Sequence, residues 1–186
     1  MGYQEKTVKK NIVFEGKIVN VRQDEAELHT GKRVLREVVE HSGGVAVLAL
    51  DGEQNAIIVR QFRYPFMKEL IEVPAGKLEQ GEEHRSAALR ELKEETGFRP
   101  EKFEFLGSIY PSPGYCAEIL YLYLARELEQ TGAEPDEDEY LNVEKIPFSS
   151  LVDMAAAGEI HDSKTLCAIF MAKERLEKES KGEMDE

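Results

Sequence analysis

The stretch GKLEQGEEHRSAALRELKEETGF, residues 76–98, carries the strongest structural signal in this chain. Residues 83–96 within it are good helix formers throughout, and a glycine follows them where a C-terminal cap belongs. A helix here places the carboxylates of Glu91 and Glu95 one above the other, four residues apart, and Glu94 joins them on the same side. The stretch therefore predicts a helix with an acidic face.

Three like charges on one helix face repel one another and weaken the helix. A divalent cation bound through carboxylate oxygens would offset this repulsion, and Mg²⁺ is suited to such a site because it keeps several waters and shares phosphate oxygens. Taken alone, the pattern leaves two interpretations open: a metal-binding face, and an acidic face that is simply solvated.

The longer pattern around the helix resembles the Nudix box, G-x5-E-x7-R-E-U-x-E-E-x-G-U, where U is a bulky apolar residue. The chain matches it at every defined position between Gly76 and Phe98. The resemblance implies an α/β/α sandwich with a mixed sheet that hydrolyses a nucleoside diphosphate linked to another group. It also implies a structural pair between Glu82 and Arg90.

The same resemblance implies that the helix carboxylates bind Mg²⁺ or Mn²⁺. Glu91 and Glu95 correspond to the principal metal ligands, and the backbone carbonyl of Ala75 to a further one. Glu94 corresponds to a supporting ligand or an orienting group.

The flanking sequences favour one branch of the family. The chain resembles the ADP-ribose pyrophosphatase branch in three flanking motifs: Gln61-Phe62-Arg63, the run EVPAG at residues 72–76, and Ser112-Pro113-Gly114. The expected reaction is hydrolysis of ADP-ribose to AMP and ribose 5-phosphate. The alternatives are another nucleoside diphosphate sugar such as GDP-mannose, NADH, or a Nudix-like nucleotide sensor, which the intact box disfavours.

Four residues outside the box are candidates for substrate binding. Arg36 and Arg63 could each bind a phosphate or a sugar hydroxyl with a forked guanidinium, although a surface ion pair is an alternative in so acidic a protein. Glu118 resembles a family residue that contacts the terminal ribose, with an exposed strand acid as the alternative. Pro113 belongs to the loop that precedes it.

The catalytic base is expected in the acid-rich segment EQTGAEPDEDE at residues 129–139. The box glutamates are engaged with metal, so a free carboxylate must deprotonate or orient the attacking water. Glu139 is the first candidate because it adjoins a predicted strand, Glu137 is the second, and Glu94 is the third. Most of the acids in this segment are expected to be solvated only.

Two regions are predicted. Residues 1–42 are β-rich, with a turn at Thr30-Gly31, and Gly43-Gly44 marks a plausible boundary; residues 43–186 form the Nudix domain, with the wholly apolar strand Val45–Leu50 at its start. Residues 1–42 have no helix to cover them, and relatives of this branch are homodimers in which these strands complete the other chain's site. A homodimer is therefore expected.

The composition further limits the classes of partner that the protein is expected to bind. The 186 residues include 24 Lys and Arg against 37 Asp and Glu, a formal net charge of −13, which argues against general nucleic-acid or anionic-membrane binding. Cys116 and Cys167 are too few for a disulfide framework. No apolar signal segment is apparent at the start, so a cytoplasmic location is the default expectation.

Overall fold

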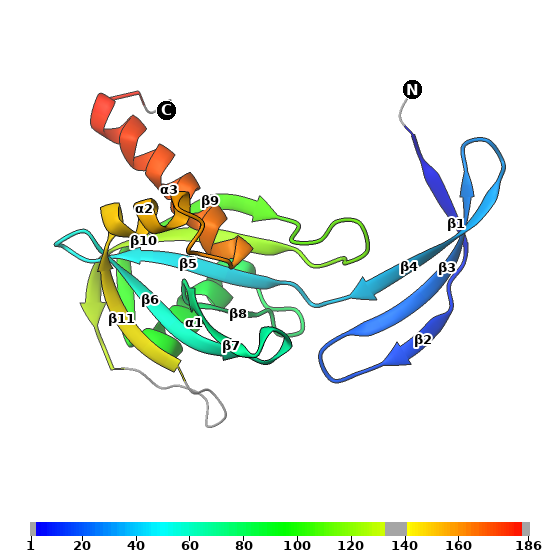
Figure 1. Cartoon of the computed structure of the whole chain (residues 1–186), viewed down its shortest axis with the longest axis horizontal. Helices are drawn as coiled ribbons and strands as arrows, with labels where there is room; N and C mark the ends of the chain where they lie inside the picture. The colour runs from blue at the N-terminus through cyan, green and yellow to red at the C-terminus, as the bar shows by residue number, and fades with distance from the viewer. Residues whose placement is uncertain (1–2, 133–140, 184–186) are drawn as a thin grey trace. The chain divides into compact units, whose positions relative to one another are not determined.

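The computed structural model describes residues 3–132 and 141–183. These fall into two compact units (Figure 1). The first, here the N-terminal unit, comprises the chain up to Gly43 together with Tyr110–Ile119. The second, here the α/β unit, comprises Gly44–Ile109 and the chain from Leu120 onward.

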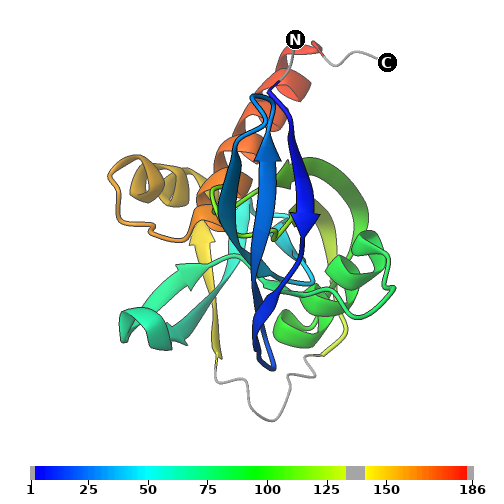
Figure 2. The same ribbon diagram turned by 90° about the vertical axis from the view of Figure 1, so that its right-hand side faces the viewer.

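The N-terminal unit is a four-stranded antiparallel sheet, seen face-on in Figure 2. Its strands are β1 (Glu5–Lys9), β2 (Ile12–Glu15), β3 (Asn20–Leu28) and β4 (Arg33–Glu40). Strand β4 pairs along one edge of β3, whereas β2 and β1 pair in succession along the other edge. The turn predicted at Thr30-Gly31 is confirmed, and Gly31 has a φ of 85° there. The sequence did not indicate β1, because its residues EKTVK are mostly charged and all exposed.

The segment 110–119 is bound to this sheet by backbone hydrogen bonds. The Val39 amide donates to the Tyr115 carbonyl (2.8 Å), and the Ala117 amide donates to the Val39 carbonyl (2.9 Å). The loop containing Pro113 and Glu118 therefore belongs to the N-terminal unit, although it lies far along the chain from β4.

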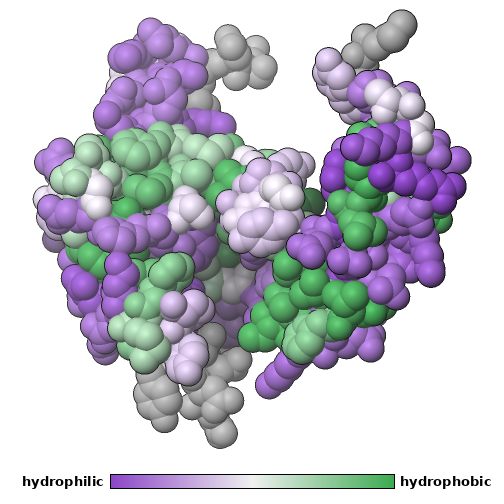
Figure 3. Space-filling model, turned by 45° about the vertical axis from the view of Figure 1, so that its right-hand side comes forward, coloured by the Kyte–Doolittle hydropathy of each residue, from purple (hydrophilic) through white to green (hydrophobic). Residues whose placement is uncertain are grey.

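The N-terminal unit buries very little apolar surface. Ala26 is the only buried apolar side chain among its described residues. Figure 3 shows apolar side chains gathered on its surface. The exposed large apolar residues of its first forty positions are Tyr3, Val8, Ile12, Val13, Phe14, Ile18 and Leu35. Exposed apolar surface of this extent is typical of a site where a protein binds a partner.

The α/β unit contains a seven-stranded mixed sheet with strand order β11-β6-β5-β10-β9, in which β7 pairs with β6 and β8 with β5. Its strands and its short 3-10 helix are β5 (Gly44–Leu50), β6 (Asn55–Arg63), η1 (Tyr64–Phe66), β7 (Lys68–Glu72), β8 (Ala75–Lys77), β9 (Phe98–Ile109), β10 (Leu120–Gln130) and β11 (Leu141–Pro147). Its α-helices are α1 (His84–Thr96), α2 (Phe148–Ala156) and α3 (Ser163–Lys181). Strand β10 runs parallel to β5 and antiparallel to β9, so the predicted mixed sheet is confirmed.

The alternation of β5 defines the two faces of this sheet. Val45, Val47 and Ala49 pack with buried residues of α1 on one face. Ala46, Leu48 and Leu50 pack with buried residues of α2 and α3 on the other face. The positions of α2 and α3 can be followed in Figure 1. Every residue of β5 is buried, as expected for a strand that is covered on both sides. The predicted α/β/α sandwich is confirmed. Among the described residues, none of the helices combines the length and apolar character needed to cross a membrane.

Candidate active site

The helix α1 begins and ends as its sequence predicts. The side chain of Glu83 caps the N-terminus by accepting a hydrogen bond from the Ser86 amide (2.9 Å). Gly97 ends the helix with a φ of 74°, a left-handed backbone conformation that residues other than glycine rarely adopt. The face toward the sheet contains the buried residues Ala87, Ala88, Leu92 and Thr96, whereas Leu89 is only partly buried. This packing fixes the rotation of the helix and hence the direction of its carboxylates.

Glu91 points at the backbone of β8. The glycine at position 76 leaves the space that its carboxylate fills, because a Cβ atom there would overlap the carboxylate of Glu91. The requirement for glycine at this box position is therefore steric: any side chain would displace Glu91 from β8.

Glu95 reaches the same backbone from one helical turn further on. Its side chain is buried, with 3% of the residue exposed, and its Oε2 accepts a hydrogen bond from the Ala75 amide (3.1 Å). The structure thus brings together the three predicted ligand positions, Ala75, Glu91 and Glu95, around the start of β8.

Arg90 forms hydrogen bonds with three acids in and just before α1. Its Nε and Nη2 donate to the two carboxylate oxygens of Glu82 (3.0 and 2.9 Å), which confirms the pair expected from the resemblance. Its Nη1 donates to Oε1 of Glu91 and to Oε2 of Glu94, both at 2.9 Å. The bonds to Glu82 are the main reason why the pKa of Arg90 is raised, and they lower the pKa of Glu82. Arg90 thereby offsets part of the repulsion that the sequence implies.

The donor chemistry around Ala75 fits a hard divalent cation. Within residues 3–132 and 141–183, no three His, Cys, Asp or Glu side chains form a ready-made metal cluster. Mg²⁺ does not need one, since it typically takes one or two carboxylates and completes its shell with waters and substrate phosphate oxygens. Glu91, Glu95 and the Ala75 carbonyl are the residues that would hold it.

Arg63, at the end of β6, is engaged by a buried acid. Its Nε and Nη2 donate to the two carboxylate oxygens of Glu72, both at 2.6 Å. Glu72 is 1% exposed, whereas the Arg63 side chain is 37% exposed. Within the described chain the Nη1 of Arg63 makes no hydrogen bond, which leaves one edge of the guanidinium available to an anion. The sequence did not indicate Glu72 as its partner, although both residues lie in the motifs that flank the box.

Three other predicted binding residues lie in the N-terminal unit. Arg36 on β4 forms a fork with Glu5 of β1 (2.9 and 2.8 Å), the surface ion pair that was the alternative interpretation. Glu118 lies 3.4 Å from Nδ1 of His41, and Pro113 lies in an exposed turn. Their part in substrate binding stays a prediction. Glu137 and Glu139 lie outside the described residues.

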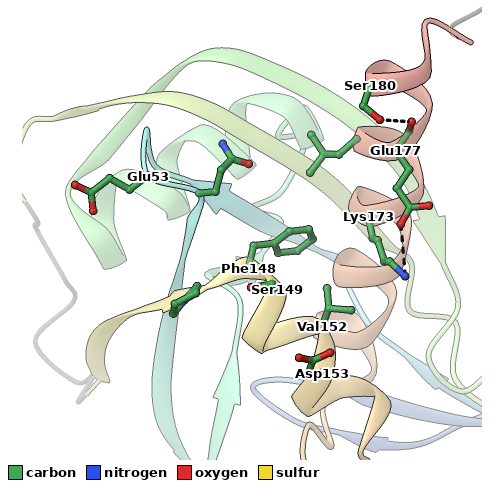
Figure 4. A pocket seen from close by; sticks show the side chains of 11 residues that line it. Glu53, Phe148, Ser149, Val152, Asp153, Lys173, Glu177 and Ser180 are labelled. Atoms are coloured by element: carbon green, nitrogen blue, oxygen red, sulfur yellow. Dashed lines mark hydrogen bonds and ion pairs between the residues drawn. The ribbon is translucent and has the colours of Figure 1, made fainter.

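A pocket of about 580 Å³ lies on the other face of the sheet, between the β5–β6 turn, the start of α2 and the second half of α3 (Figure 4). Phe148, Val152 and Leu176 contribute its apolar lining, and Lys173 and Glu177 of α3 form an ion pair beside it (3.5 Å). None of the predicted site residues within the described part of the chain lines this pocket.

The sandwich and the carboxylate helix against β8 define a Nudix hydrolase. Comparison with known proteins agrees: the NUDIX domain family matches residues 40–168, and the chain belongs to that family. It is 41% identical over 94% of its length to an ADP-ribose pyrophosphatase of Bacillus subtilis (strain 168), covering 96% of that protein. It is also 41% identical, over 90% of its length, to a methanol dehydrogenase activator of Bacillus methanolicus, covering 91% of that protein. The solved structure of an ADP compounds hydrolase shares its fold, with a TM-score of 0.82 at 22% identity over 97% of both chains.

Proposed function

We propose that this protein hydrolyses the pyrophosphate bond of ADP-ribose to AMP and ribose 5-phosphate in the presence of Mg²⁺ or Mn²⁺. The observation that carries the proposal is the convergence of Glu91 and Glu95 on the Ala75-Gly76 backbone. The 41% identity to an ADP-ribose pyrophosphatase over nearly the whole chain supports the choice of substrate. A cytoplasmic location stays an expectation from the sequence.

Each part of the site has a physical task in this reaction. A bound divalent cation would neutralise charge on the phosphates and polarise the bond to be broken. Glu91, Glu95 and the Ala75 carbonyl would hold it, and Arg90 fixes the carboxylate of Glu91 in place (2.9 Å). The free edge of Arg63 binds a phosphate oxygen. Arg36, Glu118 and Pro113 of the N-terminal unit stay candidate substrate-binding residues.

The chemical step exchanges one P–O bond for another. A water oxygen bonds to one phosphorus, the bond from that phosphorus to the bridging oxygen breaks, and the bridging oxygen leaves with the other phosphate. The proton of the water passes to a carboxylate. We assign this role first to Glu139, then to Glu137. Glu94 ranks third because its Oε2 already accepts a hydrogen bond from Arg90.

The substrate assignment is tested by product analysis of the purified full chain. ADP-ribose, GDP-mannose and NADH are incubated separately with Mg²⁺, and the products are separated and quantified. We expect AMP and ribose 5-phosphate from ADP-ribose, with the highest kcat/KM of the three. A higher kcat/KM for GDP-mannose or NADH would move the assignment to that substrate, and binding without any turnover would favour a nucleotide sensor.

The base assignment gives a second prediction. Glu139→Gln should lower kcat by roughly 10²-fold with little change in KM, because general-base assistance acts on the chemical step and not on binding. Steady-state kinetics at saturating Mg²⁺ measure this. Glu134→Gln, which removes a charge from the same acid-rich segment, is the matched control and should change neither constant. Full activity in both Glu139→Gln and Glu137→Gln would move the role to Glu94.

The similarity to a methanol dehydrogenase activator supplies a second candidate function. In this case the protein would raise the rate of a dehydrogenase. Adding the purified chain to a methanol dehydrogenase and following the oxidation rate tests this possibility, with Glu95→Gln showing whether the effect needs the hydrolase site.

A further inference from the structure

Two acids and two cations from three separate elements meet beside the proposed site. Glu72, at the end of β7, is bound by the Arg63 fork and also accepts a hydrogen bond from Nζ of Lys164 in the first turn of α3. Nζ of Lys164 also donates to Oδ1 of Asp162, the N-cap of α3 (2.9 Å). Glu72 and Lys164 are 92 residues apart in the sequence, so only the fold brings them together.

Lys164 occupies an unfavourable position for a lysine. It is 9% exposed, and it lies in the first turn of a helix, where the positive end of the helix dipole opposes a cation. Burial of an ammonium group is costly unless it is paired and hydrogen-bonded. Its two partners, Glu72 and Asp162, satisfy that condition.

The same helix start is attached to the backbone that leads into the metal-ligand segment. The hydroxyl of Thr165 accepts a hydrogen bond from the Val73 amide (2.9 Å) and donates to Oδ2 of Asp162 (2.6 Å). The next carbonyl along, that of Pro74, accepts from the Val47 amide of β5 (2.8 Å). The start of α3 is thus hydrogen-bonded to Glu72 and Val73, the residues that lead into Ala75.

The charges of this group are balanced while Lys164 is present. Arg63 and Lys164 contribute two positive charges, and Glu72 and Asp162 contribute two negative charges. Burial alone would raise the pKa of Glu72, but hydrogen bonds from Arg63 and the charge of Lys164 outweigh it, so the pKa is lowered and Glu72 is ionised at neutral pH. Without Lys164, the group around Arg63 would carry a net negative charge.

We propose that Lys164 is a positioning residue: by taking up part of the charge of Glu72 and holding that carboxylate in place, it keeps Arg63 oriented toward the anionic pyrophosphate of the substrate and keeps the group around Arg63 neutral rather than net negative. Lys164 acts through Glu72 and Arg63 and does not itself touch the substrate. The inference rests on the proposed hydrolysis of a nucleoside diphosphate.

The test uses charge variants of the full chain. Lys164→Met should raise the KM for ADP-ribose, and the Kd for ADP in Mg²⁺ measured by calorimetry, by roughly tenfold, because a net negative charge near the phosphates repels them. The kcat should change much less. Lys164→Arg keeps the charge and should stay within about threefold of the original protein. Lys173→Met removes a lysine from the exposed side of the same helix and is the matched control.

The double variant Glu72→Gln with Lys164→Met separates charge from packing. It restores the balance between Arg63 and Asp162, so KM and Kd should return most of the way to their original values. A double variant that binds no better than Lys164→Met alone would show that the charge balance around Arg63 is not how Lys164 acts and would overturn the inference. Unchanged KM and Kd in a folded Lys164→Met protein would overturn it as well.

Two further comparisons cover a Lys164→Met variant that does not fold and a failure of the proposed function. If Lys164→Met does not fold, as judged by circular dichroism, Lys164→Arg and the double variant carry the comparison. Failure of the unmodified protein to hydrolyse ADP-ribose would contradict the proposed function instead, whereas the ADP affinities of the variants would still measure the role of Lys164.

Discussion

Glu95→Gln should lower kcat by at least ~10²-fold while the protein remains as stable as before, or becomes slightly more stable. The amide oxygen of glutamine can still accept the hydrogen bond from the Ala75 amide, so the packing of α1 on β8 persists. The change removes one negative charge from a face that also carries Glu91 and Glu94, which relieves repulsion. The lost charge weakens the hold on a divalent cation, and that loss raises the barrier to the chemical step.

Three measurements check this prediction: kcat over a range of Mg²⁺ concentrations, the melting temperature, and activity after EDTA treatment. We expect EDTA to abolish turnover and Mg²⁺ or Mn²⁺ to restore it. The matched control is Glu174→Gln on α3, where the glutamate side chain is 66% exposed and pairs with Lys178. This control should keep full activity. Nearly unchanged kcat in Glu95→Gln would remove α1 from the mechanism.

Deleting residues 1–42 should abolish ADP-ribose binding and convert a homodimer into a monomer or an aggregate. The N-terminal sheet exposes large apolar side chains and has one buried aliphatic residue among those described. Such a sheet needs a partner surface, and we propose that a second copy of this chain supplies it. The deletion also removes Val39, to which the segment 110–119 is hydrogen-bonded, so the loop with Pro113 and Glu118 would lose its support.

Light scattering and calorimetric titration with ADP-ribose measure the two effects. Because a truncated chain can fail for several reasons, single variants sharpen the test. Phe14→Glu and Leu35→Glu place charges on apolar positions that are 56% and 61% exposed, and each should shift the dimer toward monomer. Phe170→Glu, at a 44% exposed position of α3, is the matched control and should stay dimeric. A monomeric truncation that still hydrolyses ADP-ribose would refute the proposal.

The helix α1 could be predicted from the sequence because its determinants are local. Carboxylates four residues apart share a helix face, and the glycine at position 97 ends the helix, whatever the rest of the chain does. The strand β5 was equally clear, because a short, wholly apolar run indicates a strand covered on both faces. By contrast, the mostly charged β1 carries no apolar pattern, and its pairing with β3 alone makes it a strand.

The candidate site was predictable in part. The box positions gave Glu91, Glu95 and their neighbour Ala75, and the structure brings them together. The sequence suggested that Arg63 binds phosphate or a sugar hydroxyl, but it gave no sign that Glu72 accepts hydrogen bonds from Nε and Nη2 of its guanidinium. Nor did any sequence signal connect Lys164 with this site.

The sequence by itself determined the class of this protein, the helix with its carboxylates, and the buried strand β5, because these follow from short-range periodicity and fixed spacing. The tertiary structure alone decided that the carboxylates of α1 meet the start of β8, that Lys164 lies under Glu72, and that residues 110–119 join the N-terminal sheet. These contacts join segments that are distant in the chain. They depend on which surfaces pack together, and packing selects among many pairings that local sequence leaves equally possible.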